Sequence, residues 1–562
     1  MTLALLMGDD ADPLLKDRLF RHQWNSLYVA CPWATIFQSC DFVATWYQIY
    51  RELYKPLLIC ETRPDGSLAG LLTLAVTADS QQLVVAGVGQ AEYHTWLSAS
   101  EHGDTFIAAA MDLLRASFLG STLKFQYLPP LAPRQWLADG SAWAKTSSLK
   151  PWFRPLMKLD GGEKLRKSLK KSSNKSRLNR MKRLGDVQFE QLHQPADLAA
   201  VFDDIIAYYD FRQGAVNDSI YFQTDPLRKQ FYLALMGVKD LLHVTVLKID
   251  NLVVAAHLGL SDGKECVLGM PAHSPFLAAH SPGKLQLLML GVELAQQGFE
   301  VLDLTPGDDL YKERFATGRD RVHVLTVFLS HQPWQKQRAD FQLWARITAG
   351  AAFKWLIGAV GIELATAKKF VDRLRSLRLT TMLNWSQSLS TKLRDKVEYQ
   401  VYAYPATAVR AESQLCSIRK DCLDHLLLFQ PVDLHQTRQD FLSLCLTRLE
   451  AGQHVYTWVE QDCLLAVFWL VKSPEQADAS GLNPVDLFEP DSALIYDYFL
   501  DRSIRDRGYD RSLIQQIVND ELFLNGTKQV YMTVLTDDPF RQTIESCGFV
   551  YKQHVYQKII IT

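Results

Sequence analysis

The chain has 562 residues, of which 48% are hydrophobic and 22% are charged. This is the profile of an ordinary globular protein with room for three or four domains. A formal net charge of −2 excludes a molecule committed as a whole to nucleic acid or to an anionic membrane, so any such preference has to be local.

The number and spacing of the cysteines indicate whether the protein works in an oxidising or a reducing compartment. There are nine of them, an odd number, and no C-x-x-C spacing occurs. Most stand in apolar runs such as "LSLCLTRL". This usage argues against a disulfide framework or a zinc site, and it predicts small buried hydrophobic residues in a reducing compartment.

Two segments bear on membrane attachment. The first residues, "MTLALLMGDD", contain a short apolar run without a basic segment before it, and Asp9 and Asp10 follow at once. This argues against a signal peptide. The longest apolar stretch, 349–365, is interrupted by Lys354 and Glu363 and is too short to span a bilayer comfortably. We therefore expect a cytoplasmic protein without a stable membrane span, in which 349–365 is a buried or interfacial helix.

The first 155 residues alternate between helix and strand signals. Apolar spacing predicts helices over 42–50 and 105–118. Two strands around a Pro-Asp-Gly turn are predicted within 55–77, and further strands over 81–89 and 121–130. This order is typical of a mixed α/β unit.

A strongly basic segment follows. From Lys164 to Arg183 there are ten lysines and arginines and no acid, and apolar residues recur at helical spacing. One or two basic helices are therefore predicted over 164–183. They either brace neighbouring elements as solvated helices or contact a polyanion, such as a nucleotide, a charged tRNA or an anionic lipid.

A second mixed unit is predicted over 186–330. Its strands are expected at 187–192, 241–249, 252–261, 265–271 and 300–304, and its helices at 196–211, 225–238 and 284–297. The loop "AHSPFLAAHSPG" leads straight into the last of these helices. Unpaired N–H groups at a helix start can seat a pyrophosphate or a carboxylate, and Gly283 allows close backbone approach. The alternative is an ordinary loop–helix junction.

The stretch "VLDLTPGDDLYKERF", residues 301–315, places charged residues at the end of a predicted strand. Either Asp303 or Asp308 could take a proton from an amine nucleophile or bind an ammonium group. Lys312 could bind a phosphate or a substrate carboxylate. The alternative is that the acids are solvated charges that pair with neighbouring basic residues, which we expect for Asp309 and Glu313.

The last part of the chain is predicted as a helical connector, 335–395, and a further mixed unit, 396–562. Strands are expected at 398–405, 454–472, 493–501, 528–535 and the C-terminus, and helices at 411–428, 435–451, 509–523 and 538–549. The segment "RSIRDRGYDRSL" places Arg505, Arg507 and Gly508 before a helix, and such arginines suit a phosphate. An exposed charged turn is the alternative.

The motifs of several kinds of functional site are absent from the sequence. The histidines His94, His257, His273 and His280 are scattered singly, and the sequence contains no H-E-x-x-H and no run of Cys and His, so we assign no metal. Nor is there a Walker-type loop, a G-x-G-x-x-G fingerprint or a G-x-S-x-G elbow.

The C-terminal unit resembles the Gcn-five-related N-acetyltransferase (GNAT) fold. In that family an R/Q-x-x-G-x-G/A loop holds the phosphates of acyl-CoA. Arg505, Gly508 and Asp510 occupy its three places, with an acid in the last. The segment 537–549 resembles the helix that follows in the family and ends in the same Gly-Phe pair, while Ile544 stands where the family has a general-acid tyrosine.

The first 330 residues resemble the CelD-like acetyltransferases, a branch of the GNAT superfamily related in fold to the FemAB peptidyltransferases. The resemblance rests on "TIFQSCDFVATWYQIY", the Tyr93-His94 step, the basic segment, "HSPGKLQLL" and a G-D-x-x-Y-K-x-x-F pattern, in this order. It implies two tandem GNAT-like halves, of which the second binds the acyl donor. The donor residues would be Ser281, Gly283, Lys284 and Leu285.

We therefore predict an α/β protein with mixed sheets and tandem GNAT-like units. The expected domains are 1–155, a GNAT-like domain without a donor site; 156–334, a second GNAT-like domain with the acyl-donor site; 335–395, a helical connector; and 396–562, a C-terminal GNAT domain. A second donor site is expected near Arg505, Arg507 and Gly508.

The resemblance implies acyl-CoA-dependent N-acyl transfer to an amine of a small molecule or amino sugar. Acyl-CoA would be the co-substrate, and Asp303, Asp308 and Lys312 would lie near the acceptor. Direct acyl transfer needs only a neutral amine, a polarised carbonyl and a proton for the thiolate. Two alternatives stay open: a FemAB-like transferase that uses aminoacyl-tRNA, and a non-catalytic GNAT-fold scaffold.

Overall fold

The computed structural model describes residues 1–307, 309–331, 336, 396–405, 418–431, 436–474, 476 and 491–558. Contacts divide the chain into two compact units. Unit 1 contains Met1–Asp203, Asp225–Ala272 and Gly283–Phe353, and unit 2 contains Asp204–Thr224, His273–Pro282 and Lys354–Thr562. Apart from residue 336, the predicted connector 335–395 lies outside the described residues, and the division into four domains stays a prediction.

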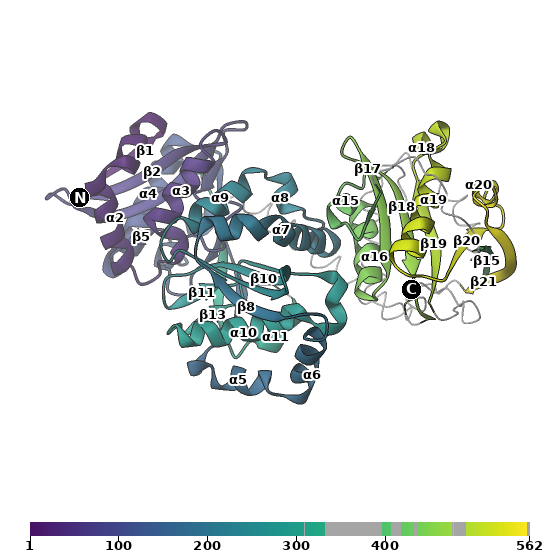
Figure 1. Cartoon of the computed structure of the whole chain (residues 1–562). Helices are drawn as coiled ribbons and strands as arrows, with labels where there is room; N and C mark the ends of the chain where they lie inside the picture. Colours follow the sequence, from purple (N-terminus) through teal and green to yellow (C-terminus); the bar gives the residue numbers. More distant parts are fainter. Residues whose placement is uncertain are drawn as a thin grey trace, which may run out of the picture. The chain divides into compact units, whose positions relative to one another are not determined.

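An antiparallel sheet opens unit 1, with the order β1-β2-β3-β4 and β5 paired to β3. Its strands are β1 (Thr2–Met7), β2 (Tyr54–Thr62), β3 (Leu68–Thr77), β4 (Leu83–Val85) and β5 (Leu97–Ser98). Figure 1 shows helices α2 (Arg18–Ala30), α3 (Cys40–Ile49) and α4 (Gly103–Ser117) beside it. The predicted hairpin of β2 and β3 is confirmed. The pairing of β1 along β2 was not predicted, because its apolar run is too short to show a period.

A second sheet has the order β11-β13-β7-β14-β6. Its strands are β6 (Thr122–Leu128), β7 (Ser147–Lys158), β11 (Glu265–Val267), β13 (Val301–Asp303) and β14 (Gly318–Phe328). The long strand β7 pairs with both β13 and β14 and runs across the predicted boundary between residues 155 and 156. Strands from both predicted halves therefore share one sheet.

A third sheet has the order β12-β10-β9-β8. It contains β8 (Val187–Leu192), β9 (Leu242–Ile249), β10 (Leu252–Leu260) and β12 (Met270–His273). The β9–β10 hairpin is confirmed, with Asp250 at a φ of +53° in its turn.

The strand predicted at 265–271 is two strands in two different sheets. Its first part, β11, runs parallel to β13, whereas its second part, β12, belongs to the sheet of β10. The change occurs at Gly269, where an added Cβ would lie 2.8 Å from the carbonyl oxygen of Leu258. The two sheets therefore diverge beside Asp303, the last residue of β13.

The helices of this region follow the sequence pattern. The basic segment forms two helices, α5 (Glu163–Leu169) and α6 (Ser172–Met181), and the other predicted helices appear as α7 (Pro195–Asn217), α9 (Leu227–Met236) and α10 (Pro282–Gln296). Leucines of α10 pack on Met157 and Leu302 of the second sheet. No helix in the described part of the chain is long and apolar enough to cross a membrane.

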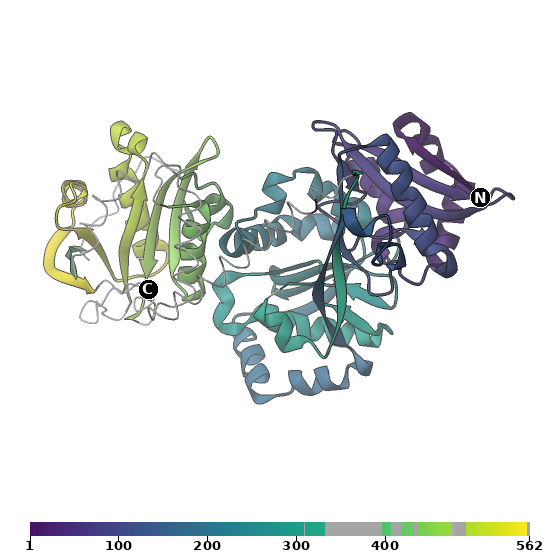
Figure 2. The ribbon, with the colours of Figure 1, turned by 180° about the vertical axis from the view of Figure 1, so that it is seen from behind.

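Unit 2 is built on one sheet with the order β16-β17-β18-β19-β20-β15-β21. The strands are β15 (Lys396–Tyr404), β16 (Arg419–Lys420), β17 (His454–Glu460), β18 (Cys463–Val471), β19 (Ser492–Leu500), β20 (Gln529–Leu535) and β21 (Val550–Lys558), which can also be followed from behind in Figure 2. The helix predicted over 411–428 is wrong for Arg419–Lys420, which form a strand; in the described part of that range the helix is α15 (Leu423–Leu427).

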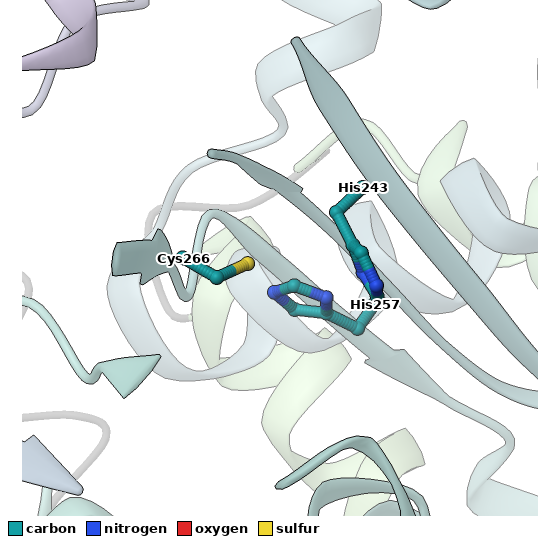
Figure 3. Close-up of side chains that lie close together, drawn as sticks. All are labelled: His243, His257 and Cys266. Atoms are coloured by element: carbon teal, nitrogen blue, oxygen red, sulfur yellow. The ribbon is translucent and has the colours of Figure 1, made fainter. Parts of the chain in front are cut away.

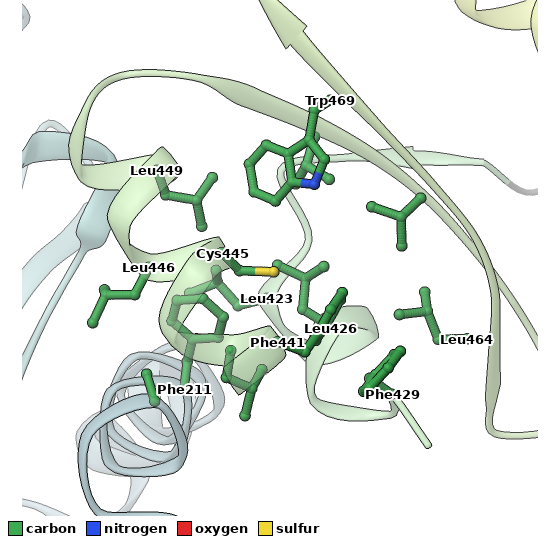
Figure 4. Packing of buried hydrophobic residues seen from close by; sticks show 14 of the residues in the cluster. Phe211, Leu423, Leu426, Phe429, Phe441, Cys445, Leu446, Leu449, Leu464 and Trp469 are labelled. Carbon is green, nitrogen blue, oxygen red and sulfur yellow. The ribbon is translucent and has the colours of Figure 1, made fainter. Parts of the chain in front are cut away.

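Both faces of this sheet are buried, since alternate residues of a strand point to opposite faces. Val467 and Trp469 of β18 pack with α15 and α16 (Arg438–Glu450), whereas Phe468 and Leu470 pack with α19 (Asp510–Asn519) and α20 (Phe540–Ser546). Figure 4 shows the first of these clusters, to which α7 contributes Phe211.

A buried carboxylate lies at the edge of the second cluster. Glu521 has no exposed surface and accepts hydrogen bonds from Lys420 Nζ at 2.7 Å and Tyr456 Oη at 2.7 Å, while Lys472 Nζ lies 2.8 Å away. Burial alone would raise the pKa of Glu521, but these partners outweigh burial and lower it to about 2.

Replacing Glu521 with glutamine should destabilise unit 2 by about 3 kcal/mol, because two lysines then lose their buried anion. The pKa of Glu521 is lower in the folded state than the ordinary value of 4.5, so its stabilisation is present above pH 4.5 and is lost as the pH falls toward 2. Urea unfolding from pH 7 to pH 3 should show a smaller loss for the variant. Glu545→Gln, in a half-exposed ion pair, is the control and should change stability by less than about 1 kcal/mol.

Candidate active site

The polar centre of unit 1 is Asp303, the last residue of β13, which is fully buried. Its Oδ2 accepts a hydrogen bond from Tyr93 Oη at 2.5 Å, and its Oδ1 accepts one from the backbone N–H of Thr305 at 2.8 Å. Arg154 Nη1 lies 3.4 Å from Oδ2. Burial raises the pKa of Asp303, and these three partners oppose the rise because each favours the ionised carboxylate.

Arg154 of β7 joins this centre to the neighbouring strands. Its Nε and Nη2 donate to the two carboxylate oxygens of Asp320 at 2.8 and 2.6 Å. Glu265 lies 3.7 Å from Nη1, and the guanidinium stands 5.6 Å from the ring centre of Tyr93. One cation therefore faces three carboxylates, from β11, β13 and β14.

A further acid, Glu92, lies beside this network, in the loop before β5. Its side chain is partly buried. Burial and the negative charge of Asp303 raise the pKa of Glu92 to about 7, while the positive charge of Lys312 opposes the rise. A carboxylate with this pKa can accept a proton at neutral pH, as a general base must. The sequence singled out the adjacent Tyr93-His94 step and missed Glu92.

Lys312 is the predicted site residue whose surroundings differ most from the prediction. It lies in α11 (Leu310–Phe315) and is 7% exposed. Its Nζ lies 3.1 Å from Asp309 Oδ2 and donates to Thr305 Oγ1 at 3.2 Å and to the carbonyl oxygen of Pro306 at 3.5 Å. The ammonium group therefore holds the loop after β13, and its charge acts on Glu92. The second candidate carboxylate, Asp308, lies outside the described residues.

The backbone of this loop is strained at Thr305, which has a φ of +61°. A β-branched residue is rarely found in this region, and such outliers cluster at functional sites. The Thr305 N–H bond to Asp303 and the Lys312 bond to the Thr305 side chain hold the conformation in place. The loop is therefore fixed by the same residues that surround the buried carboxylate.

A pocket of about 290 Å³ lies on the outer side of this loop. It is lined by Gly307, by the Glu313–Arg319 ion pair and by Trp152 and Phe153 of β7. Trp152 is 39% exposed and Phe153 59% exposed. Aromatic rings beside a charged pair suit a small ligand that has one apolar and one polar face.

The predicted donor residues stand at the start of α10. Ser281 has a φ of +52° and directly precedes this 15-residue helix, and Leu285 is fully buried. Burial lowers the pKa of Lys284, and the positive charges of Arg177, Lys171 and Arg314 lower it further. The structure therefore brings basic residues of α6, α10 and α11 together. Positive charges that lie together at the N-terminus of a helix form a binding site for an anion.

The second predicted donor site lies in unit 2. Arg507 stands, as predicted, just before a helix, α19, but it also ends a helix that was not predicted, α18 (Arg502–Arg507). Its guanidinium lies 2.7 Å from Glu460 and faces the rings of Trp458 and Tyr509. Gly508 follows with a φ of +71° and an open Cβ position, and the side chain of Arg505 lies outside the described ones. Arg507 is therefore already engaged within unit 2.

Two parallel strands also part in unit 2. β19 and β20 are paired from Ser492–Gln529 to Ile495–Met532, although they continue to Leu500 and Leu535. The parallel pairing therefore ends before either strand ends.

Three comparisons relate these features to known proteins. Residues 164–313 match the family described as "Acetyltransferase (GNAT) domain". This range includes α5, α6, the start of α10 and Lys312. The sequence has no significant match among curated proteins.

Solved structures that match part of the chain include the following three. FemX is 10% identical, with a TM-score of 0.40 over 54% of this chain and 95% of its own. A tandem GNAT protein from the clavulanic acid biosynthesis pathway is 12% identical, with a TM-score of 0.36 over 58% and 99%. L-PGS from Bacillus licheniformis is 12% identical, with a TM-score of 0.35 over 56% and 92%. At these scores the likenesses do not bear on function.

The family match and the mixed sheets agree with the fold expected from the sequence. The match covers the helix start at Lys284 and the strand that ends at Asp303. Residues 164–313 are therefore a GNAT acetyltransferase domain, and this match supports an acyltransferase.

Proposed function

We propose that unit 1 transfers an acyl group from acyl-CoA to the amine of a small molecule, such as an amino sugar or an amino-acid-like metabolite. The observation that carries this proposal is that residues of α11 act on both a candidate general base and a candidate anion-binding residue. Lys312 acts on the pKa of Glu92, and Arg314, two residues further on, acts on that of Lys284. A proton acceptor and a phosphate-binding group therefore lie beside two nearby positions of one short helix, on different faces of it.

Each of the following residues has its own role in the proposed acyl transfer. Lys284, Lys171 and Arg177 hold the phosphates of acyl-CoA at the start of α10. Glu92 takes a proton from the acceptor ammonium, and the neutral nitrogen forms a bond to the thioester carbonyl carbon while the carbon–sulfur bond breaks. The thiolate leaves with the electron pair and takes up the second proton, which the acylated nitrogen gives up as it becomes an amide. Asp303 and Arg154 position this centre, and the pocket beside Gly307 takes the acceptor.

Calorimetry of the full chain with acetyl-CoA and with longer acyl-CoAs tests the donor. We expect binding of at least one of them, and Lys284→Ala should weaken it about tenfold or more, since a hydrogen bond to a charged group contributes about 1.5–3 kcal/mol. Lys167→Ala is the matched control, because Lys167 is exposed and pairs with Glu163. No heat with any acyl-CoA would overturn the proposal.

The same samples separate the FemAB-like alternative. The basic helices α5 and α6 are the feature that favours it, because ten positive charges over 164–183 suit a polyanion. Binding of charged tRNA that weakens steeply with salt, without any binding of acyl-CoA, would replace acyl-CoA by aminoacyl-tRNA as the donor.

A further inference from the structure

Three chemically reactive side chains meet in the core of unit 1, on strands that lie next to the candidate active site. They are His243 of β9, His257 of β10 and Cys266 of β11, and all three are buried. Figure 3 shows the imidazole of His257 between the sulfur of Cys266 and the imidazole of His243. One ligand atom from each lies within 4.8 Å of the others. The sequence assigned no metal, because the three residues are far from the spacing of a metal motif.

The strand register explains how the two histidines come together. His243 stands opposite Gly259, and His257 stands opposite Thr245, so the histidines are diagonal neighbours on one face of the hairpin. Gly259 has no side chain, so His257 and the carbonyl oxygen of Val267 can both lie close to its Cα. An added Cβ there would lie 2.7 Å from His257 Nε2 and 1.9 Å from the carbonyl oxygen of Val267.

The imidazole nitrogens of the two histidines make few hydrogen bonds in the described part of the chain. Both nitrogens of His243 and Nδ1 of His257 are buried and make no hydrogen bond of normal geometry in the described part of the chain, although the side chain of Gln297 lies close enough to His243 to act on its pKa. His257 Nε2 lies 3.3 Å from the carbonyl oxygen of Val267. Buried polar atoms without partners are costly, and an imidazole that donates one nitrogen to a carbonyl is the usual arrangement of a metal ligand.

We propose that His243, His257 and Cys266 bind a borderline-soft divalent transition metal ion, with zinc as the first choice. Two imidazole nitrogens and one sulfur are ligands that Zn²⁺ commonly takes. Ligand atoms around a tetrahedral zinc ion lie about 3.3–3.6 Å apart, so the side chains need to close in by about 1 Å.

One of the three proposed ligands, His243, borders a cavity. A cavity of about 460 Å³ is lined by His243 together with Gln297, Phe299 and Ser261. Water or the Gln297 amide oxygen can therefore complete the coordination from this side. Because β11 belongs to one sheet and β9 and β10 to another, a bound ion would tie the two sheets together close to the point where they part.

Titration of the reduced, chelator-treated full chain with Co²⁺ tests the proposal directly. We expect one ion per chain, a sulfur-to-cobalt charge-transfer absorption and a raised melting temperature, and Zn²⁺ should displace the signal. Cys266→Ser should abolish the charge-transfer absorption. Cys60→Ser, at a buried cysteine of β2, is the control and should keep it.

Two outcomes would overturn the site. One is that the wild-type chain takes up no stoichiometric Co²⁺ or Zn²⁺, a result that needs no variant to fold. The other is a charge-transfer absorption of full strength in Cys266→Ser. Circular dichroism of each metal-free variant shows whether a lost signal reflects lost ligation or lost folding.

Discussion

Replacing Glu92 with glutamine should lower turnover about 10²–10⁴-fold, because the amide cannot accept the proton of the acceptor amine. The variant should bind acyl-CoA as tightly as the wild type. In the wild type, kcat/KM should rise with pH through about 7, as Glu92 loses its proton, and level off above that pH. Release of CoA from acyl-CoA, followed with a panel of amino sugars and amino acids from pH 5 to pH 9, measures both effects.

Two further variants make this test specific. Glu101→Gln removes an exposed acid from the same half of unit 1 and should leave the profile unchanged. Asp303→Asn removes the charge that raises the pKa of Glu92, so any remaining activity should rise at a lower pH. Full turnover in Glu92→Gln would rule out Glu92 as the base.

Replacing Arg154 with methionine should destabilise unit 1 by about 3–5 kcal/mol, the usual result of removing one partner from a buried ion network. Arg154 is 8% exposed and is the cation between Asp303, Asp320 and Glu265. Its loss leaves the fully buried Asp303 without a counter-ion. Urea unfolding at pH 7 measures the change in the free energy of unfolding.

The matched variant is Arg319→Met, on the same strand as Asp320. Arg319 forms an exposed ion pair with Glu313 and should cost less than about 1 kcal/mol. Lowering the pH should reduce the difference between Arg154→Met and the wild type, because burial raises the pKa of Asp303 and of Glu265, and the protonated carboxyl groups no longer need a cation beside them. Equal stability of the two variants would mean that the network around Asp303 is not stabilising.

Local patterns predicted the order of elements well. The β9–β10 hairpin, the two basic helices and α10 follow from periodicity and turn residues, which act within a few positions. The strand at 265–271 was predicted as one piece, since its change of sheet depends on the close packing of Gly269 against Leu258, which no local pattern records.

The candidate site was harder to predict than the fold. Asp303 was found because it ends a strand, and Lys284 because it opens a helix after a glycine. Glu92 stands in a loop without a period, and its raised pKa depends on Asp303, which is distant in sequence. The helix α18 around Arg507 was missed because a charged Arg-Asp-Arg-Gly run has the composition of a turn.

The helix α7 constrains where the polypeptide can be cut. Its first residues belong to unit 1, and residues from Asp204 onward belong to unit 2. There Phe211 and Ala215 share a core cluster with Leu442 and Cys445 of α16. A fragment ending at the predicted boundary, residue 334, would lose the partners of that apolar stripe and present it to solvent. Truncation at that boundary would therefore yield an aggregation-prone fragment, and the shorter protein would need polar replacements on α7.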